Sequence, residues 1–455
     1  MNNQETTGYE TAHRQAEQIF RQILPSCGMT AREGQIRLCH TMLDALFGRE
    51  IALCDAGVGL GKTYAYLVAA ILWMQQCALP LRQPVIVSTA SIALQDAILN
   101  NYIPFLSDVL IQYGIIDSSI QAVLRKGKGR YACDLRLSQR QREVARRGER
   151  FARRLRVLQH VDACLDLDRV RGLTGYDRRR ICVPERCGKD CAARNQCRYQ
   201  HYLYQAEHDS IQIQVCNHNY LLADAFHRQN GWKPLLRDYS AILIDEAHKL
   251  PEVNQQMQTR SLRVADLQDL ANRLANENRV HEAQQLKRTA NLLAAAFTPL
   301  PTERMDCVLF GPQEKQTTAL KQLVRLLQAC FQQAGGKLAP PVRQAIQHTA
   351  ELAQLFLVQD TQWIRYVEYE AGPDTTRRFA ALHAVPADLP RSLDAALWSQ
   401  EKPAILTSGT LAAGGDFSNT RRQLGLEHGI PVRTLQVPSP FDYAHNSLLV
   451  FPETT

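Results

Sequence analysis

The stretch from Glu50 to Thr63, EIALCDAGVGLGKT, determines how the rest of this sequence is interpreted. It begins as a short apolar strand, passes through a glycine-rich turn and enters an apolar helix at Lys62. The turn contains three glycines, Gly57, Gly59 and Gly61. Glycines let successive backbone N–H groups point at one anion, and the N-terminus of a helix favours negative charge. The stretch therefore predicts a phosphate-binding loop, with Ala56 where the usual pattern has its first glycine; an ordinary strand-to-helix turn is the alternative.

Apolar strands that alternate with helices predict the architecture around this loop. PVIVSTA has the continuous apolar character of a parallel strand covered on both faces, AILI is a four-residue apolar strand, and PAILTSGTL resumes the sheet after a long, mostly helical stretch. This alternation is typical of an α/β fold with a doubly wound parallel sheet. Because the carboxyl ends of such strands face the ligand crevice, we expect Ser88 and Thr89 to contact nucleic acid.

A pair of carboxylates follows the AILI strand. Asp245 and Glu246 open the tetrapeptide DEAH, in the same chain as the phosphate loop. This position suits magnesium and water, so Asp245 is expected to hold the metal and Glu246 to orient or deprotonate the attacking water. Gln35 precedes the loop, and its amide offers the donor and the acceptor needed to read an adenine edge. The alternatives are an exposed acidic turn and a solvent-facing glutamine.

Length and composition limit the class of protein. The 455 residues exceed one ordinary domain, and two to four domains are expected. The chain has 45% hydrophobic and 22% charged residues, lacks an apolar run of about 18 residues and begins with MNNQETTGYE, which has no signal-peptide pattern. We therefore interpret it as cytoplasmic, with no membrane partner. Thirteen cysteines in that setting argue for reduced thiols or metal ligands instead of disulfides.

The positive charge is concentrated in one segment. The whole chain carries a net charge of +8, whereas residues 125–180 alone hold 18 lysines and arginines against 7 aspartates and glutamates. Arginine suits phosphates through its planar fork and permanent charge, so the segment predicts a polyanion-binding surface. A solvated helix face is the alternative. The predicted contacts are Arg146, Arg147, Arg153 and Arg154.

Cysteines cluster directly after the basic segment. The stretch CVPERCGKDCAARNQC carries Cys182, Cys187, Cys191 and Cys197, and Cys133 precedes it. Scattered buried thiols explain this density poorly. Three of these cysteines, spaced Cys-x3-Cys-x5-Cys, together with one distant cysteine suit zinc or an iron–sulfur cluster, and the spacing does not choose between them.

Taken in chain order, these motifs resemble the DinG/XPD-like iron–sulfur helicases of superfamily 2, and more closely the bacterial DinG branch. The matching pieces are REGQ, AGVGLGKT, STASIALQ, KGKGRYAC, the cysteine cluster, CNHNYLLAD, DEAH, LTSGTL and SPFDY, which together extend over nearly the whole chain. The resemblance implies a RecA-like P-loop lobe with a cysteine-rich insert and a mostly helical, Arch-like insert. It also implies an ATP-driven motor that moves 5′ to 3′ on single-stranded DNA and unwinds duplexes at junctions.

The resemblance further implies a role for each site residue. These roles are Gln35 at adenine, Gly57, Gly59, Gly61 and Lys62 at the phosphates, Thr63 and Asp245 at Mg²⁺, Glu246 at the hydrolytic water, and His248 as the link between the ATP state and DNA. A [4Fe–4S] cluster would be held by Cys133, Cys187, Cys191 and Cys197. Cys182 would then lie outside the ligand set.

Two features depart from the family pattern. Gly409 stands in LTSGTL where the family usually has alanine, and the chain stops at Thr455, where family members continue into a second RecA-like lobe. The expected parts are a first lobe in three pieces (1–115, 211–255 and 396–445), an Fe–S insert (116–210), a helical insert (256–395) and the start of a missing second lobe (446–455).

This organisation favours binding of ATP, cluster and DNA over unwinding, with a separate second lobe as a candidate partner. The alternatives are a DNA-binding Fe–S module with weak or no ATPase activity, one half of a split motor, and a phosphate-loop ATPase that acts on protein partners.

Overall fold

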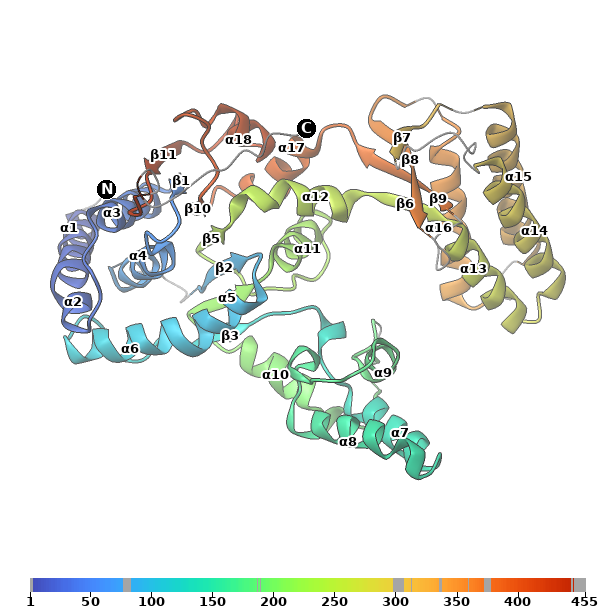
Figure 1. Cartoon of the computed structure of the whole chain (residues 1–455), viewed down its shortest axis with the longest axis horizontal. Coiled ribbons are helices and arrows are strands. Elements are labelled where there is room, and N and C mark those ends of the chain that lie inside the picture. The colour runs from blue at the N-terminus through green and yellow to red at the C-terminus, as the bar shows by residue number, and fades with distance from the viewer. Residues whose placement is uncertain are drawn as a thin grey trace, which may run out of the picture. The chain divides into compact units, whose positions relative to one another are not determined.

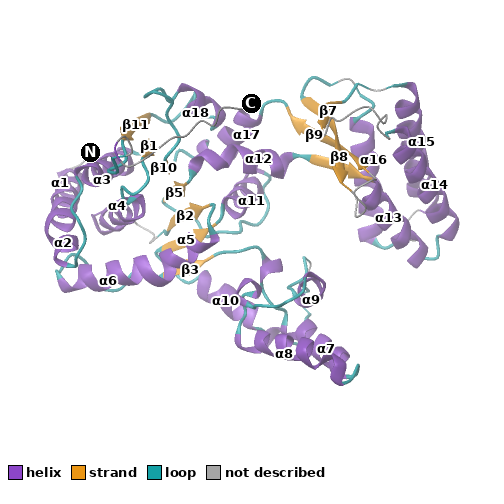
Figure 2. Ribbon diagram, in the orientation of Figure 1, coloured by secondary structure: helices purple, strands orange, loops and turns teal. Residues whose placement is uncertain are grey.

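The protein divides into two compact units, one formed by Met1–Val253 with Pro390–Thr455 and the other by Asn254–Leu389. The first unit contains a seven-stranded sheet, and the second contains a four-stranded sheet with its own helices (Figures 1 and 2). The structure is a computed structural model, and it describes residues 3–76, 83–185, 187–188, 190–297, 307–311, 313–334, 338–358, 360–371, 378–442 and 445.

The sheet of the first unit is parallel at every registered strand pair. Its strands, in spatial order, are β11 (Val432–Val437), β1 (Ile51–Ala56), β10 (Ala404–Ser408), β5 (Ala241–Asp245), β2 (Val85–Thr89), β4 (Ile213–Cys216) and β3 (Ala122–Leu124). Strand β1, which leads into the phosphate loop, therefore lies between β10 and β11, and β5 lies one strand further along.

Helices cover both faces of this sheet because its central strands are apolar on both sides. In β1, Ala52 and Cys54 pack into the core formed with α1, α3, α4 and α6, whereas Ile51 and Leu53 pack into the opposite core with α11. The predicted doubly wound parallel sheet is confirmed. The helices associated with the sheet are α1 (Asn3–Gln18), α2 (Leu24–Ser26), α3 (Glu33–Gly48), α4 (Lys62–Gln76), α5 (Ile92–Ala97), α6 (Ile103–Gln112), α11 (His218–Gln229), α12 (Leu250–Gln258), α17 (Leu389–Leu393) and α18 (Ser418–Gln423).

The basic and cysteine-containing insert lies in the chain between the edge strand β3 and its neighbour β4. Its helices are α7 (Asp134–Ala145), α8 (Ala152–His160), α9 (Gly175–Ile181) and α10 (Arg198–Ala206). Few apolar side chains are available, so the described residues of the insert form two small cores. One core includes Leu137, Leu158 and Ile181, and the other is formed by Tyr131, Val183 and Tyr199. From here on, we call the segment 125–211 the insert.

The second unit combines helices with an antiparallel sheet that the sequence analysis did not predict. The helices are α13 (Val264–Asn276), α14 (Val280–Ala296), α15 (Glu314–Ala334) and α16 (Pro340–Leu355). The strands, in spatial order, are β6 (Arg260–Arg263), β9 (Arg378–Pro386), β8 (Trp363–Ala371) and β7 (Cys307–Leu309). The helices pack through apolar residues three and four apart, such as Leu267, Leu270 and Leu274. Within the described part of the chain, every helix is too short or too polar to span a bilayer.

Candidate functional site

The phosphate loop joins the end of β1 to the start of α4 and depends on its glycines in two ways. Gly59 and Gly61 have φ angles of +83° and +88°, a region that other residues enter only at a cost in energy. A Cβ atom on Gly61 would also lie 2.3 Å from Nε2 of Gln35, and one on Gly57 would lie 2.3 Å from the backbone nitrogen of Ser439. The glycines therefore permit both the turn and the close approach of two other segments.

Side chains from those segments hold the loop backbone in place. Nη1 of Arg32 donates to the carbonyl oxygen of Gly59 (2.7 Å), and Nε2 of Gln35 donates to that of Gly61 (2.8 Å). On the other side, Oγ of Ser439 donates to the carbonyl oxygen of Val58 (2.8 Å). Gln35 is thus a buried support of the loop, and its contact with adenine stays a prediction.

The register of the parallel strands brings the candidate residues to one edge of the sheet. Asp55 of β1 lies beside Ser408 of β10, and Thr407 of β10 lies beside Asp245 of β5. Asp245 in turn lies beside Thr89 of β2. The carboxyl ends of four strands therefore meet next to the phosphate loop, which is where ligands bind in open α/β sheets.

Lys62 and Glu246 flank the same space from different elements. Nζ of Lys62 lies 3.9 Å from Oε1 of Glu246 and donates to the carbonyl oxygen of Ala56 at 3.3 Å. Glu246 has a φ of +53°, a left-handed conformation that is unfavourable for a residue with a side chain. Backbone strain of this kind is concentrated at functional sites, so it supports a chemical role for Glu246.

Asp245 has the properties of a cation ligand. Its side chain is buried, and burial together with the neighbouring charge of Glu246 raises its pKa to about 6. Among the described residues, its Oδ1 atom has no hydrogen-bond partner. A buried carboxylate oxygen without a donor suits a hard divalent cation. Thr63, the second residue of α4, follows Lys62 and is the other predicted ligand.

A hydrogen-bonded trio connects DEAH to the LTSGTL motif. Oγ of Ser408 lies 2.7 Å from Nδ1 of His248 and donates to Oε2 of Glu246 at 3.3 Å. The sequence analysis assigned no role to Ser408, although its place at the end of a strand within a motif is the signal that identifies it. His248 therefore contacts Glu246 both directly, with 3.3 Å between Nδ1 and Oε2, and through Ser408 of a neighbouring strand.

Ser88 and Thr89 do not fit their predicted role. Both side chains are fully buried, and Oγ of Ser88 lies 2.7 Å from Nδ1 of His218. Burial lowers the pKa of His218 to about 4, so this histidine is neutral near pH 7. These residues support the interior of the sheet edge, and a nucleic acid cannot reach them. The role of His218, which lies in CNHNYLLAD, was missed by the sequence analysis.

The predicted cluster ligands are only partly brought together. Cys133 and Cys197 both pack against the core formed by Tyr131, Val183 and Tyr199, whereas Cys182 packs against the other core of the insert. Cys187 is exposed and Cys191 is partly buried. Within the described residues, no three histidine, cysteine, aspartate or glutamate side chains are grouped closely enough to hold a metal ion.

The parallel sheet, the glycine-rich loop and the acid pair define a phosphate-loop protein with a RecA-like fold. No protein-family model matches the chain. The chain is 26% identical over 446 residues to the ATP-dependent DNA helicase YoaA of Escherichia coli (strain K12), a match that covers 93% of this chain and 66% of the relative.

Two further relatives are named DinG. The chain is 23% identical over 469 residues to the ATP-dependent helicase DinG of Mycobacterium tuberculosis (97% of this chain, 68% of the relative). It is 22% identical over 518 residues to the 3'-5' exonuclease DinG of Bacillus subtilis (100% and 53%). The chain is therefore a homologue of YoaA and DinG, which confirms the resemblance to DinG/XPD-like helicases. It spans about two thirds of the length of YoaA.

Proposed function

We propose that this chain is the ATP-hydrolysing part of a DNA helicase that moves 5′ to 3′ on single-stranded DNA and acts at duplex junctions. The observation that carries the proposal is the placement of Lys62 and Glu246, whose side chains lie 3.9 Å apart beside the buried Asp245. The names of the YoaA and DinG relatives support ATP as the nucleotide and DNA as the partner.

In this proposal the loop and the residues next to it have separate roles in phosphoryl transfer. The backbone N–H groups of the loop and Lys62 bind the phosphates, and Thr63 and Asp245 hold Mg²⁺, which neutralises phosphate charge. Lys62 faces Glu246 across this space. A triphosphate competes for this lysine, which leaves the Glu246 carboxylate available to orient water and accept its proton.

The trio of Glu246, Ser408 and His248 is the proposed route from the nucleotide to the DNA side. Glu246 lies 3.3 Å from both Ser408 and His248, and Ser408 lies 2.7 Å from His248, so a change at Glu246 during turnover has two short routes to the histidine. Coupling through a short chain of hydrogen bonds requires no large movement of the strands.

Rates of ATP hydrolysis with and without single-stranded DNA test the proposal. Stimulation by DNA is expected for the helicase motor. DNA binding without hydrolysis would instead support a DNA-binding module, and hydrolysis indifferent to DNA would support an ATPase that acts on another partner. The control is an equal mass of a neutral polymer, which should leave the rate unchanged.

We further propose that Cys133, Cys187, Cys191 and Cys197 hold a [4Fe–4S] cluster. The shared packing of Cys133 and Cys197, 64 positions apart in the sequence, supports this set, and the separate packing of Cys182 supports its exclusion. The cluster would join the two ends of the insert.

Metal content of protein purified without oxygen tests the cluster. We expect iron with broad visible absorption; one equivalent of zinc without iron would contradict the proposal. Serine at any of the four positions should remove the iron. Cys182→Ser is the matched control and should retain it, so iron loss in that variant would redraw the ligand set.

A further inference from the structure

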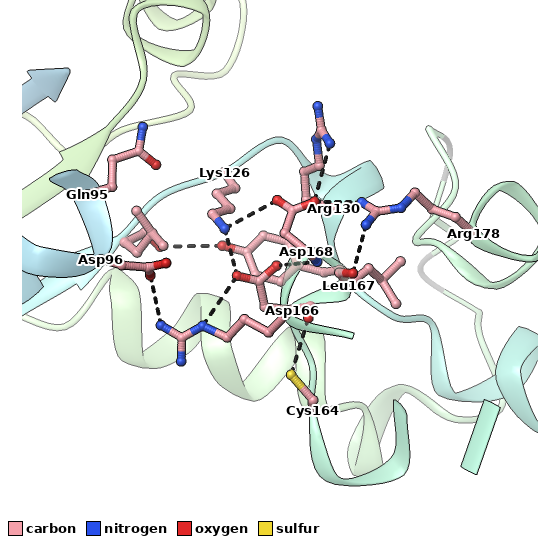
Figure 3. Close-up of polar contacts among 12 residues, drawn as sticks. Gln95, Asp96, Lys126, Arg130, Cys164, Asp166, Leu167, Asp168 and Arg178 are labelled. Carbon is pink, nitrogen blue, oxygen red and sulfur yellow. Dashed lines mark hydrogen bonds and ion pairs between the residues drawn. The ribbon is translucent and has the colours of Figure 1, made fainter. Parts of the chain in front are cut away.

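Two groups of cations in the insert differ in their partners. The first group lies near the sheet, and each of its members is bonded to an acid. Nζ of Lys126 lies 2.7 Å from Asp166, and Nη1 of Arg178 lies 2.6 Å from Asp168. Figure 3 shows Lys126 with Asp166 and Asp168, and Arg130 and Arg178 with Asp168. Arg169 pairs with Asp96 of α5. These charges are neutralised by the chain itself.

The second group lines a pocket of about 980 Å³ that is formed by α8, the start of α9 and the segments before them. Its lining contains one carboxylate, Asp177. Its arginines are Arg147, Arg150, Arg153, Arg154 and Arg171. Only Arg154 pairs with the carboxylate, and the other four arginines have no acid within 4 Å among the described residues. The pocket therefore keeps an excess of positive charge.

One aromatic ring, that of Phe151, lies beside two of these arginines. The guanidinium carbons of Arg147 and Arg150 lie 5.8 Å and 4.9 Å from the ring centroid of Phe151. A cation–π contact positions a guanidinium without occupying its N–H donors, which remain available to an anion. The arrangement restrains the cations and leaves their hydrogen-bonding capacity for a ligand.

Asp177 connects the helices that form the pocket. Arg154 donates to it through Nε (2.6 Å) and Nη2 (2.8 Å), and the buried Arg140 donates through Nε (2.9 Å). These bonds tie α7, α8 and α9 to one another. Arg154 therefore has a structural role, its contact with DNA stays a prediction, and Arg146 lies outside the pocket lining.

We propose that this pocket binds adjacent phosphate groups of a single-stranded nucleic acid through Arg147, Arg150, Arg153 and Arg171. The four side chains offer permanent charge and forked donors, which match phosphate oxygens, and contacts to phosphates carry no sequence information. The identity of the strand rests on the proposed function. The binding of phosphate groups does not rest on that function, because a free polyphosphate presents the same groups. Inorganic triphosphate is therefore tested as a separate ligand.

The test compares two variants that lose the same charge. The pocket variant replaces Arg147, Arg150, Arg153 and Arg171 with alanine. The matched control replaces four exposed arginines of the same region outside the pocket lining, Arg142, Arg146, Arg156 and Arg179, with alanine. Circular dichroism of both variants confirms that they remain folded. Binding of a fluorescent oligothymidylate is then measured over a range of salt concentrations, with inorganic triphosphate as the second ligand.

We expect the pocket variant to bind oligothymidylate at least about tenfold more weakly than the control variant. Its plot of log affinity against log salt should be shallower, by about 0.7 per lost phosphate contact. Equal affinities and slopes for the two variants would overturn the pocket. Triphosphate binding that needs the four arginines, combined with oligothymidylate binding that does not, would overturn the strand as the ligand.

The two proposals fail in different ways. If DNA does not stimulate hydrolysis but oligothymidylate binding depends on the pocket, the proposed motor function fails and the pocket stands. If DNA stimulates hydrolysis and the two variants bind alike, the pocket fails and the motor function stands.

Discussion

The space beside the phosphate loop that Lys62 and Glu246 flank, here called the crevice, and the arginine-lined pocket of the insert both present positive charge, but different groups surround that charge. In the crevice, Lys62 lies 3.9 Å from Glu246, and the acid Asp245 is buried next to it. In the pocket, Arg147 and Arg150 lie over Phe151, and neither has an acid within 4 Å in the part of the chain that the structure describes. In the crevice, one lysine beside two acids takes part in one reaction geometry, so its removal should stop the reaction. In the pocket, several arginines without acid partners share the binding of one ligand, so removal of one should only weaken binding. Substitutions should therefore act on turnover in the first region and on affinity in the second.

Lys62→Ala should have the largest effect. It removes the only lysine of the loop and nothing from a core, so we expect hydrolysis to fall by about 10³-fold while the melting temperature is retained. Phosphate release and thermal denaturation measure the two quantities. Lys249→Ala, an exposed lysine just after DEAH, is the control and should hydrolyse at the parent rate. Undiminished hydrolysis in Lys62→Ala would remove the loop from the mechanism.

Glu246→Gln should separate binding from turnover. The amide fits the same space but cannot accept a proton from water, so hydrolysis should fall by about 10²- to 10³-fold with ATP affinity retained. Nucleotide binding and single-turnover hydrolysis are measured on the same preparation. The exposed Glu207→Gln is the control. Hydrolysis of Glu246→Gln at the parent rate would show that the acid pair is misassigned.

Asp177→Asn should damage the pocket and leave the crevice intact. The side chain of Asp177 is 2% exposed and holds two arginines, so its loss leaves the buried Arg140 with Glu143, at 2.6 Å, as its remaining acidic partner. We expect the insert to lose about 2 kcal/mol of stability through the lost charged hydrogen bonds and to become sensitive to protease, while ATP binding persists. Asp162→Asn, an exposed aspartate of the same insert, should have little effect. Equal protease resistance in both variants would contradict the structural role of Asp177.

The same carboxylate predicts an acid dependence. Burial alone would raise the pKa of Asp177, but hydrogen bonds from Arg154, Arg140 and Thr174 outweigh it and hold that pKa below its ordinary value. A lowered folded-state pKa gives a contribution that is complete above the ordinary aspartate pKa of about 3.9 and is lost as pH falls through the folded-state value. Between about pH 5 and pH 3, urea unfolding should therefore show a steeper loss of stability in the parent than in Asp177→Asn.

Gly409→Ala should have the smallest effect. A Cβ at this position would lie 3.5 Å from the carbonyl oxygen of Ala56 and 3.9 Å from Nζ of Lys62, which are ordinary contacts. Because the φ of Gly409 is not among the positive values, alanine should stabilise the protein by about 0.5 kcal/mol through the unfolded chain. Thermal denaturation measures this, and hydrolysis should be unchanged. A lower melting temperature would show that the turn needs glycine.

Local sequence was enough to predict the parts of the site that each lie within one short segment. The phosphate loop and the acid pair each follow a continuous apolar strand, and that pattern predicts both the strand and the polar groups at its end. The second sheet was missed because β8 mixes charged and aromatic residues and lies among strongly amphipathic helices.

Partner choice could not be predicted, because it depends on contacts between distant segments. Ser408 bonds to His248 across 160 positions, and nothing near either residue indicates the other. Likewise, all arginines of the basic segment look alike in sequence. The arginines differ in whether they have an acidic partner, and this is decided only by the fold. Asp177 pairs with Arg154, 23 positions away, whereas Arg171 has no acid within 4 Å among the described residues.

The junction of the second unit has a consequence for its autonomy. Its first residue, Asn254, is fully buried and donates from Nδ2 to the carbonyl oxygen of its last residue, Leu389, at 3.1 Å. The second unit thus begins and ends at two residues that are hydrogen-bonded to each other, which is the geometry of a domain inserted into another domain. Because the second unit begins and ends at neighbouring residues, a short turn can replace it without separating α12 from α17. The strand order of the seven-stranded sheet is then the same with or without this domain.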